Sequence, residues 1–227
     1  MKYIIIGLGN FGTALGEKLT EMGHEVIGVD KFLDKLESVK ERLSYAVCLD
    51  STDRKAMETL PLADTDVVIV AIGEDEGASL LTTAILKQMK VKRLIGRTLS
   101  PVHTTILEAM GVDEIIKPEE EAADRMVKKL TIKGVVDSFF LSDRFNIIEA
   151  KVPSRYVGMS IGNVDFRSKY NVVVLTIMRI KKQKNIIGAE INKRSVLGVV
   201  GPEIVMEEDD ILVLFGDLKF IRQFLES

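Results

Sequence analysis

A glycine-rich turn near the start of the chain limits its fold more than any other feature. The segment Gly7-Leu8-Gly9-Asn10-Phe11-Gly12 follows an apolar run, Tyr3–Ile6, and precedes residues 13–22, whose apolar side chains recur at helical spacing. Glycines in this arrangement let the backbone turn tightly, approach a diphosphate and pack a helix on a strand, while N–H groups at the helix start face the anion. The motif therefore predicts the strand, phosphate-binding turn and helix of a Rossmann-type unit.

An acidic residue, Asp30, directly follows the next apolar run, Glu25–Val29. A carboxylate at the end of the second strand can accept hydrogen bonds from both ribose hydroxyls of an adenosine, and it repels a 2′-phosphate. The sequence therefore predicts NAD(H) or an adenine nucleotide (ATP, ADP or AMP) as the ligand, rather than NADP. The alternative is a Rossmann unit that keeps the glycines without a ligand.

Short apolar runs alternate with helical segments over residues 1–130. Because these runs are apolar throughout, they are typical of parallel strands that are covered on both faces. We therefore expect a Rossmann-like, doubly wound α/β domain whose ligand crevice lies at the carboxyl ends of its strands. The predicted strands are Tyr3–Ile6, Glu25–Val29, Tyr45–Leu49, Asp66–Ala71, Arg93–Gly96 and Glu114–Ile116.

Polar and small residues follow most of these strands. Since the carboxyl ends of parallel strands meet at one edge, we expect these residues to rim a single crevice. Two alternatives remain open: Ser51 and Thr52 could cap the next helix, and Arg97 could pair with an acid instead of a phosphate. Besides the glycine turn and Asp30, the predicted crevice residues are Lys31, Asp50, Ser51, Thr52, Ile72, Gly73, Glu74 and Arg97.

The pattern becomes rich in β-strands after a helix that we expect from Pro118 to Leu130, whose early acids suit the helix dipole. Residues 131–144 are expected to connect the two parts, and the apolar segment Val135–Leu141 to be packed. Residues 145–227 are predicted to form a small α+β domain. Its expected elements are the strands Asn146–Val152, Val172–Arg179, Ile186–Glu190, Ile204–Met206 and Ile211–Phe215 and a helix, Leu218–Leu225.

Composition excludes several classes of function. A net charge of -3, with both signs interspersed, disfavours a nucleic-acid partner. The one cysteine, Cys48, is expected to be a small buried strand residue, and a single thiol fits a reducing compartment. No apolar run approaches the ~20 residues of a membrane helix, and the chain opens on a strand and not on a signal segment. The expected location is cytoplasmic.

The chain offers little for catalysis. Its two histidines, His24 and His103, both fall in the first domain and are expected at surface or capping positions. We find neither zinc-ligand spacing nor a nucleophile elbow. The enzyme alternative is a small NAD-dependent oxidoreductase of the siroheme-synthase type, which would share the glycines and Asp30.

The order and separation of several segments resembles a known family, the regulatory subunits of Trk and Ktr potassium uptake systems. These subunits combine an N-terminal RCK domain, a crossover helix and a small C-terminal RCK domain. The resemblance covers nearly the whole chain. It rests on the segments IIIGLGNFGTALGEKLTEMGHEVIGVD, VVIVAIGEDEGASLLTTAILKQMKVKRLIGRT, ILEAMGVDEIIKPEEEAADRM, DFRSKYNVVVLTIMR and DDILVLFGDLKFIRQF.

The resemblance implies a ligand-gated regulator and not an enzyme. It implies that the chain binds ATP, ADP or NAD(H) and forms homodimers through a crossing helix and hinge, with Val135–Leu141 as the packed crossover. The dimers would assemble into an octameric ring at the inner face of the cell membrane, beneath a potassium-translocating subunit. A gating module for another transporter is the alternative that shares these features.

The resemblance also implies roles for particular residues. Asn10 stands where the ATP-sensing members commonly have an arginine, so the preferred nucleotide stays open; alternatively, Asn10 is a turn residue. Glu119 aligns with a glutamate that holds a divalent cation, Mg²⁺ or Ca²⁺, and its alternative role is with the helix dipole. Ile161, Arg167 and Pro202 lie at positions comparable to a cyclic di-AMP site, or to an ordinary dimer interface.

Overall fold

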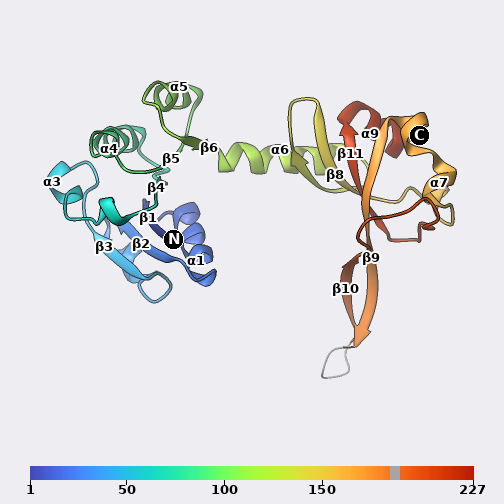
Figure 1. Cartoon of the computed structure of the whole chain (residues 1–227), viewed down its shortest axis with the longest axis horizontal. Helices are drawn as coiled ribbons and strands as arrows, with labels where there is room; N and C mark the ends of the chain where they lie inside the picture. Colours follow the sequence, from blue (N-terminus) through green and yellow to red (C-terminus); the bar gives the residue numbers. More distant parts are fainter. Residues whose placement is uncertain (185–189) are drawn as a thin grey trace. The chain divides into compact units, whose positions relative to one another are not determined.

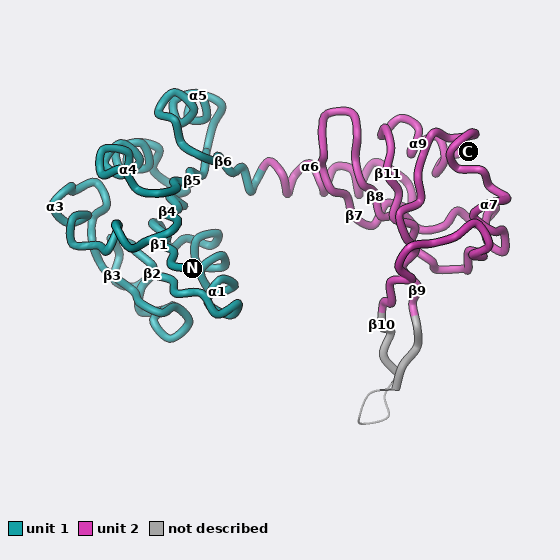
Figure 2. Tube along the Cα trace, viewed as in Figure 1, with its two compact units in different colours: residues 1–119 teal, residues 120–227 magenta. Residues whose placement is uncertain are grey.

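The computed structural model describes residues 1–184 and 190–227, and the chain divides into two compact units (Figure 2). Unit 1 comprises residues 1–119 and unit 2 comprises residues 120–227. The division falls within the first turn of helix α6 (Pro118–Thr131), whereas the sequence analysis assigned this helix to the first domain.

Unit 1 is the predicted doubly wound parallel sheet, with the strand order β3-β2-β1-β4-β5-β6 (Figure 1). The order reverses between β1 and β4, so the crevice expected of such a fold opens at the carboxyl ends of these two strands. All six predicted strands are confirmed: β1 (Lys2–Ile6), β2 (Glu25–Asp30), β3 (Tyr45–Cys48), β4 (Val67–Val70), β5 (Leu94–Arg97) and β6 (Glu114–Ile116).

Apolar clusters cover both faces of this sheet. Ile4 and Ile6 of β1 pack in one cluster and Ile5 in the other, because successive strand residues point to opposite faces. The cluster around Ile5 includes residues of α1 and α2, and the other cluster includes residues of α3 and α4. The helices of unit 1 are α1 (Asn10–Glu21), α2 (Leu33–Glu37), α3 (Arg54–Met57), α4 (Glu76–Gln88), α5 (Pro101–Ala109) and a 3-10 turn, Leu62–Asp64.

Unit 2 is built on an antiparallel sheet with the order β10-β9-β11-β8-β7. Its strands are β7 (Val135–Phe140), β8 (Phe145–Lys151), β9 (Val172–Lys184), β10 (Glu190–Val196) and β11 (Ile211–Asp217). Besides α6, the helical segments are a 3-10 turn (Ser154–Tyr156), α7 (Ile161–Val164), α8 (Phe166–Tyr170) and α9 (Leu218–Glu226).

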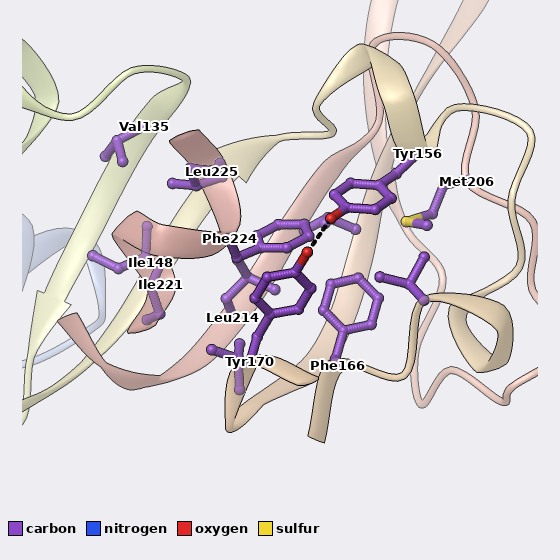
Figure 3. Close-up of a cluster of buried hydrophobic side chains, with 14 of the residues drawn as sticks. Val135, Ile148, Tyr156, Phe166, Tyr170, Met206, Leu214, Ile221, Phe224 and Leu225 are labelled. Atoms are coloured by element: carbon purple, nitrogen blue, oxygen red, sulfur yellow. Dashed lines mark hydrogen bonds between the residues drawn. The ribbon is translucent and has the colours of Figure 1, made fainter. Parts of the chain in front are cut away.

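The core of unit 2 centres on Phe224 of α9 (Figure 3). The Phe224 ring stacks on Tyr156 at 5.1 Å between ring centroids and meets Phe166 at 5.0 Å and Tyr170 at 5.3 Å. The two phenol oxygens of Tyr156 and Tyr170 share a hydrogen bond of 2.5 Å inside this core. Ile221, Phe224 and Leu225 are buried at helical spacing, which explains why the end of the chain folds as a helix on the sheet.

Unit 2 differs from the sequence-based expectation in two places, and a third expected strand falls mostly outside the described residues. The expected strand Ile204–Met206 is wrong, because this segment forms only an isolated bridge between Val205 and Ser160. The expected packed crossover, Val135–Leu141, is mostly the edge strand β7, paired with β8. Residues 186–189 of the expected strand Ile186–Glu190 lie outside the described residues, and β10 begins at Glu190.

Two side chains of unit 1 differ in burial from the expectation, although His103 does bind the backbone at a helix start, as the capping alternative expected. Cys48 is exposed and not buried, because it ends an edge strand of the sheet. His103 is fully buried in α5, where its Nδ1 accepts a hydrogen bond from the Leu99 N–H at 3.3 Å. Burial lowers the pKa of His103, so the side chain is held neutral within the fold.

Candidate functional site

The glycine turn between β1 and α1 is held by close backbone packing. Gly7 has a φ of +96°, and a β-carbon there would lie 2.8 Å from the Ile72 nitrogen. A β-carbon at Gly12 would overlap the Gly7 carbonyl oxygen. A β-carbon at Gly9, in contrast, would meet no atom within 4 Å among the described residues. Gly7 and Gly12 therefore shape the turn, and Gly9 faces open space.

We expect Gly12→Ala to destabilise the chain by about 1–3 kcal/mol, as overpacking does, and to distort the turn. Gly9→Ala is the matched control, since its added methyl group has room in the ligand-free protein and its backbone has a negative φ of -74°. Urea unfolding of both variants measures the difference. Equal stability of the two variants would contradict the packing role of Gly12.

The start of α1 leaves backbone donors available to a ligand. Its N-cap residue is Gly9, which has no side chain to accept a hydrogen bond from the first turn. The N-cap of α4, in contrast, is Asp75, which accepts a hydrogen bond from the Ala78 N–H at 2.8 Å. The first N–H groups of α1 have no partner within the helix and carry the positive end of its dipole, so they suit an anion.

Asp30 closes the crevice beside this helix start. Its carboxylate is 7% exposed and accepts hydrogen bonds from the Leu8 N–H at 2.8 Å and from the Phe32 N–H at 3.0 Å. The ammonium group of Lys35 lies 3.7 Å from the same carboxylate. Asp30 therefore ties the glycine turn to the end of β2. Its remaining lone pairs can accept hydrogen bonds from ribose hydroxyls.

A cavity of about 430 Å³ lies at the carboxyl ends of the strands, where the sequence places the crevice. Within unit 1, Gly12 and Thr52 do not line it. Lining residues that the sequence analysis did not single out include Phe32, Lys35, Asp75 and Ala78. The predicted residues that line it are Gly7, Gly9, Asn10, Phe11, Asp30, Lys31, Asp50, Ser51, Ile72, Gly73, Glu74, Arg97 and Glu119.

The three predicted residues after β3, Asp50, Ser51 and Thr52, make different hydrogen bonds within the fold. Asp50 accepts hydrogen bonds from the Thr52 N–H at 2.9 Å and the Thr52 hydroxyl at 2.7 Å. These bonds, the hydroxyl first, and the nearby charge of Lys31 lower the pKa of Asp50. The Ser51 hydroxyl shares a buried hydrogen bond of 2.8 Å with Thr82. The cap of α3 is Asp53, so the alternative that Ser51 or Thr52 caps this helix is wrong.

Arg97 pairs with an acid, as one of the two alternatives expected. Its guanidinium donates a short hydrogen bond to the carboxylate of Glu119 and lies 5.8 Å from the centre of the Phe11 ring. A second guanidinium nitrogen lies 3.4 Å from the Ala71 carbonyl oxygen. The end of β5 is thereby joined to the glycine turn, to β4 and to the first turn of α6.

The residues present do not form a cation site on their own. Glu119 offers one carboxylate, and Arg97 already binds it. Across residues 1–184 and 190–227, no group of three or more His, Cys, Asp or Glu side chains is arranged to hold a metal ion. The cation predicted at Glu119 would therefore depend on oxygens that a ligand supplies.

In unit 2, two of the three residues predicted for cyclic di-AMP lie close together. Ile161 begins α7 and packs partly buried on the core, and its neighbour Gly162 donates a hydrogen bond to the Pro202 carbonyl oxygen at 2.9 Å. Arg167 lies exposed on the next helix, α8.

The fold and the cavity define a class of protein: a two-unit chain with a Rossmann-type nucleotide crevice and a separate antiparallel β-sheet unit. Within the described residues, no helix has both the length and the apolar character needed to cross a membrane.

Comparison with known proteins identifies the family. The TrkA-N domain matches residues 3–118. Ktr system potassium uptake protein C of Bacillus subtilis (strain 168) is 32% identical over 98% of this chain and 95% of its own length. Protein A of the same system and organism is 30% identical over the same shares. The chain therefore belongs to the TrkA-N family of Trk and Ktr potassium uptake proteins.

A solved structure confirms the fold. The GsuK channel bound to NAD has a TM-score of 0.65 and 18% identity over the whole of this chain, which spans 39% of the channel's own chain. The full-length relatives are potassium uptake proteins, which excludes the oxidoreductase alternative.

Proposed function

We propose that this chain is a regulatory subunit that senses an adenine nucleotide or NAD(H) in the unit 1 cavity and gates a membrane potassium-translocating partner. One observation carries the proposal: a buried carboxylate, Asp30, stands beside an uncapped helix start at a cavity. The names of the full-length relatives support the potassium uptake system, and the NAD in the structure of the GsuK channel supports the ligand class.

The geometry fits an adenosine diphosphate moiety. Asp30 would accept hydrogen bonds from the ribose, and the first turn of α1 would hold the diphosphate. A ligand of this kind regulates only through its different affinities for two conformations. Asn10 lines the cavity as a neutral residue at the helix start, so it favours no particular number of phosphates by charge.

Mass spectrometry of nucleotides that copurify with the protein tests the ligand. We expect NAD(H), ATP, ADP or AMP at a substantial fraction of one per chain. Calorimetry with ADP and NAD on nucleotide-free protein provides the second measurement. Absence of binding for both would refute the nucleotide-sensing role.

We further propose that a second copy of the chain covers the apolar side of α6, in a homodimer that assembles into an octameric ring. None of the residues of α6, all of which the structure describes, is buried. Three large apolar residues of α6 are among the exposed ones: Met126, Val127 and Leu130, the last of them 77% exposed. Phe139 and Phe140 of β7 are exposed as well. Exposed apolar residues at helical spacing are typical of a helix with a partner.

Light scattering tests this assembly. We expect wild-type protein at micromolar concentration to be larger than a dimer, and Val127→Glu with Leu130→Glu to reduce its mass, because two charges would be buried against a partner. Lys129→Glu, on the same helix turn, is the control and should leave the mass unchanged. A monomeric wild type would refute the ring.

The remaining expectations stay proposals. The subunit would act at the cytoplasmic face of the membrane beside its partner. A Mg²⁺ or Ca²⁺ ion would join Glu119 only together with ligand phosphates. Cyclic di-AMP would bind near Ile161, Arg167 and Pro202 between two copies of unit 2.

A further inference from the structure

Arg97 is an almost buried cation in the wall of the cavity. Its side chain is 12% exposed, and its Nε is buried without a hydrogen-bond partner among the described residues. A charged group that has lost most of its water needs an anionic partner to offset the cost of burial. Glu119 is the acid that supplies this partner in the structure.

The cavity is shaped around the guanidinium group of Arg97. A β-carbon at Gly73 would overlap the Arg97 Nη1, so only glycine leaves room for the side chain in this position. The ring of Phe11, in the glycine turn, lies with its centre 5.8 Å from the central carbon of the guanidinium group, Cζ. The guanidinium is therefore held beside the turn that binds phosphate in the proposed function, and its planar donors suit phosphate as well as carboxylate.

Glu119, the partner of Arg97, is held far less firmly than Arg97 itself. The Glu119 side chain is 65% exposed and sits in the first turn of α6. A hydrated carboxylate on a helix start can leave the pair at lower cost than Arg97, whose side chain is only 12% exposed. The pair is thus asymmetric: the cation is fixed and the anion is replaceable.

We propose that Glu119 is a built-in competitor for the phosphate-binding residue Arg97. This inference rests on the proposed function. A phosphate group of the ligand replaces the carboxylate of Glu119 at Arg97, and the first turn of α6 is released from the cavity wall. Ligand binding and the anchoring of α6 then oppose each other, and the coupling is reciprocal. In the absence of a divalent cation, Glu119 lowers the affinity for phosphorylated ligands, and Arg97 raises their affinity above that of the plain nucleoside.

Calorimetry in EDTA with ADP and with adenosine tests the exchange. We expect Glu119→Gln to raise the affinity for ADP about threefold or more, because a competing ion pair is removed, and to leave adenosine binding unchanged. Glu121→Gln is the matched control, since it removes a neighbouring acid from the same helix turn. Arg97→Gln should weaken ADP binding and abolish the effect of Glu119→Gln.

Hydrogen exchange provides a readout that does not depend on affinity. Amides of residues 121–125 should exchange faster in ligand-free Glu119→Gln, and in wild type saturated with ADP, than in ligand-free wild type. Unchanged ADP affinity in Glu119→Gln would overturn the exchange while leaving the proposed function intact. A lower affinity in EDTA would also overturn it, because Glu119 would then aid binding. If neither wild type nor Glu119→Gln binds ADP or NAD, the proposed function is overturned, and with it the proposed competition between Glu119 and phosphate.

Discussion

Asp30→Asn is expected to weaken the binding of ADP and NAD by at least about tenfold. The ribose hydroxyls would lose hydrogen bonds to a charged acceptor, each worth ~1.5–3 kcal/mol. The variant also loses one acceptor for the backbone, since Leu8 and Phe32 donate to different oxygens of the carboxylate. The expected effect on binding therefore combines lost ribose contacts with a less well held glycine turn.

Calorimetry with ADP measures the affinity, and urea unfolding measures how much of the loss is structural. Asp34→Asn is the matched control, because it removes an exposed acid only four residues away, in α2. We expect the control to bind ADP as wild type does. Unchanged affinity in a folded Asp30→Asn protein would remove Asp30 from the ligand site.

The frame of this site was predictable from the sequence, because it depends on backbone rules. A strand, a glycine turn, a helix and an acid at the next strand end fix where the crevice lies, and the cavity forms there. The side-chain pairings were not predictable. Arg97 reaches Glu119 across 22 residues of sequence, and whether it finds an acid or a phosphate depends on the packing of Gly73 and Phe11 around it.

The burial of individual side chains was also not predictable from the sequence. Cys48 lies in an apolar run that suits a buried strand, but β3 is at the edge of the sheet and leaves the thiol exposed. His103 lies at a helix start that suits a surface or capping position; its ring does accept a hydrogen bond from the Leu99 N–H, but α5 packs against α4 and the ring is buried. Both errors have one cause: local pattern indicates the element, whereas burial depends on which element lies beside it.

Unit 2 contains an ion pair, Arg179–Asp210, that no sequence motif predicts. Asp210 is fully buried before β11, where its carboxylate accepts hydrogen bonds from Arg179 of β9 at 2.9 and 2.8 Å and from the Glu207 N–H at 2.8 Å. Arg179 also donates to the Val205 carbonyl oxygen at 3.0 Å. The pairing raises the pKa of Arg179. The loop before β11 is thus fastened to β9 by one buried charge pair.

Asp210→Asn is therefore expected to destabilise unit 2 by about 1–3 kcal/mol, because the hydrogen bonds of a buried carboxylate are weakened and Arg179 keeps only the exposed carboxylate of Glu207 as its counter-charge. Hydrogen exchange of β9 and β11 peptides measures this loss separately from unit 1. Glu207→Gln is the matched control: its carboxylate also pairs with Arg179, at 2.5 Å, but is 58% exposed, so we expect a loss of at most about 1 kcal/mol. Combining Arg179→Met with Asp210→Leu should recover most of the stability, since no buried charge remains and Glu207 is exposed to water. Equal losses in Asp210→Asn and Glu207→Gln would show that burial of the pair adds nothing to the fastening of this loop.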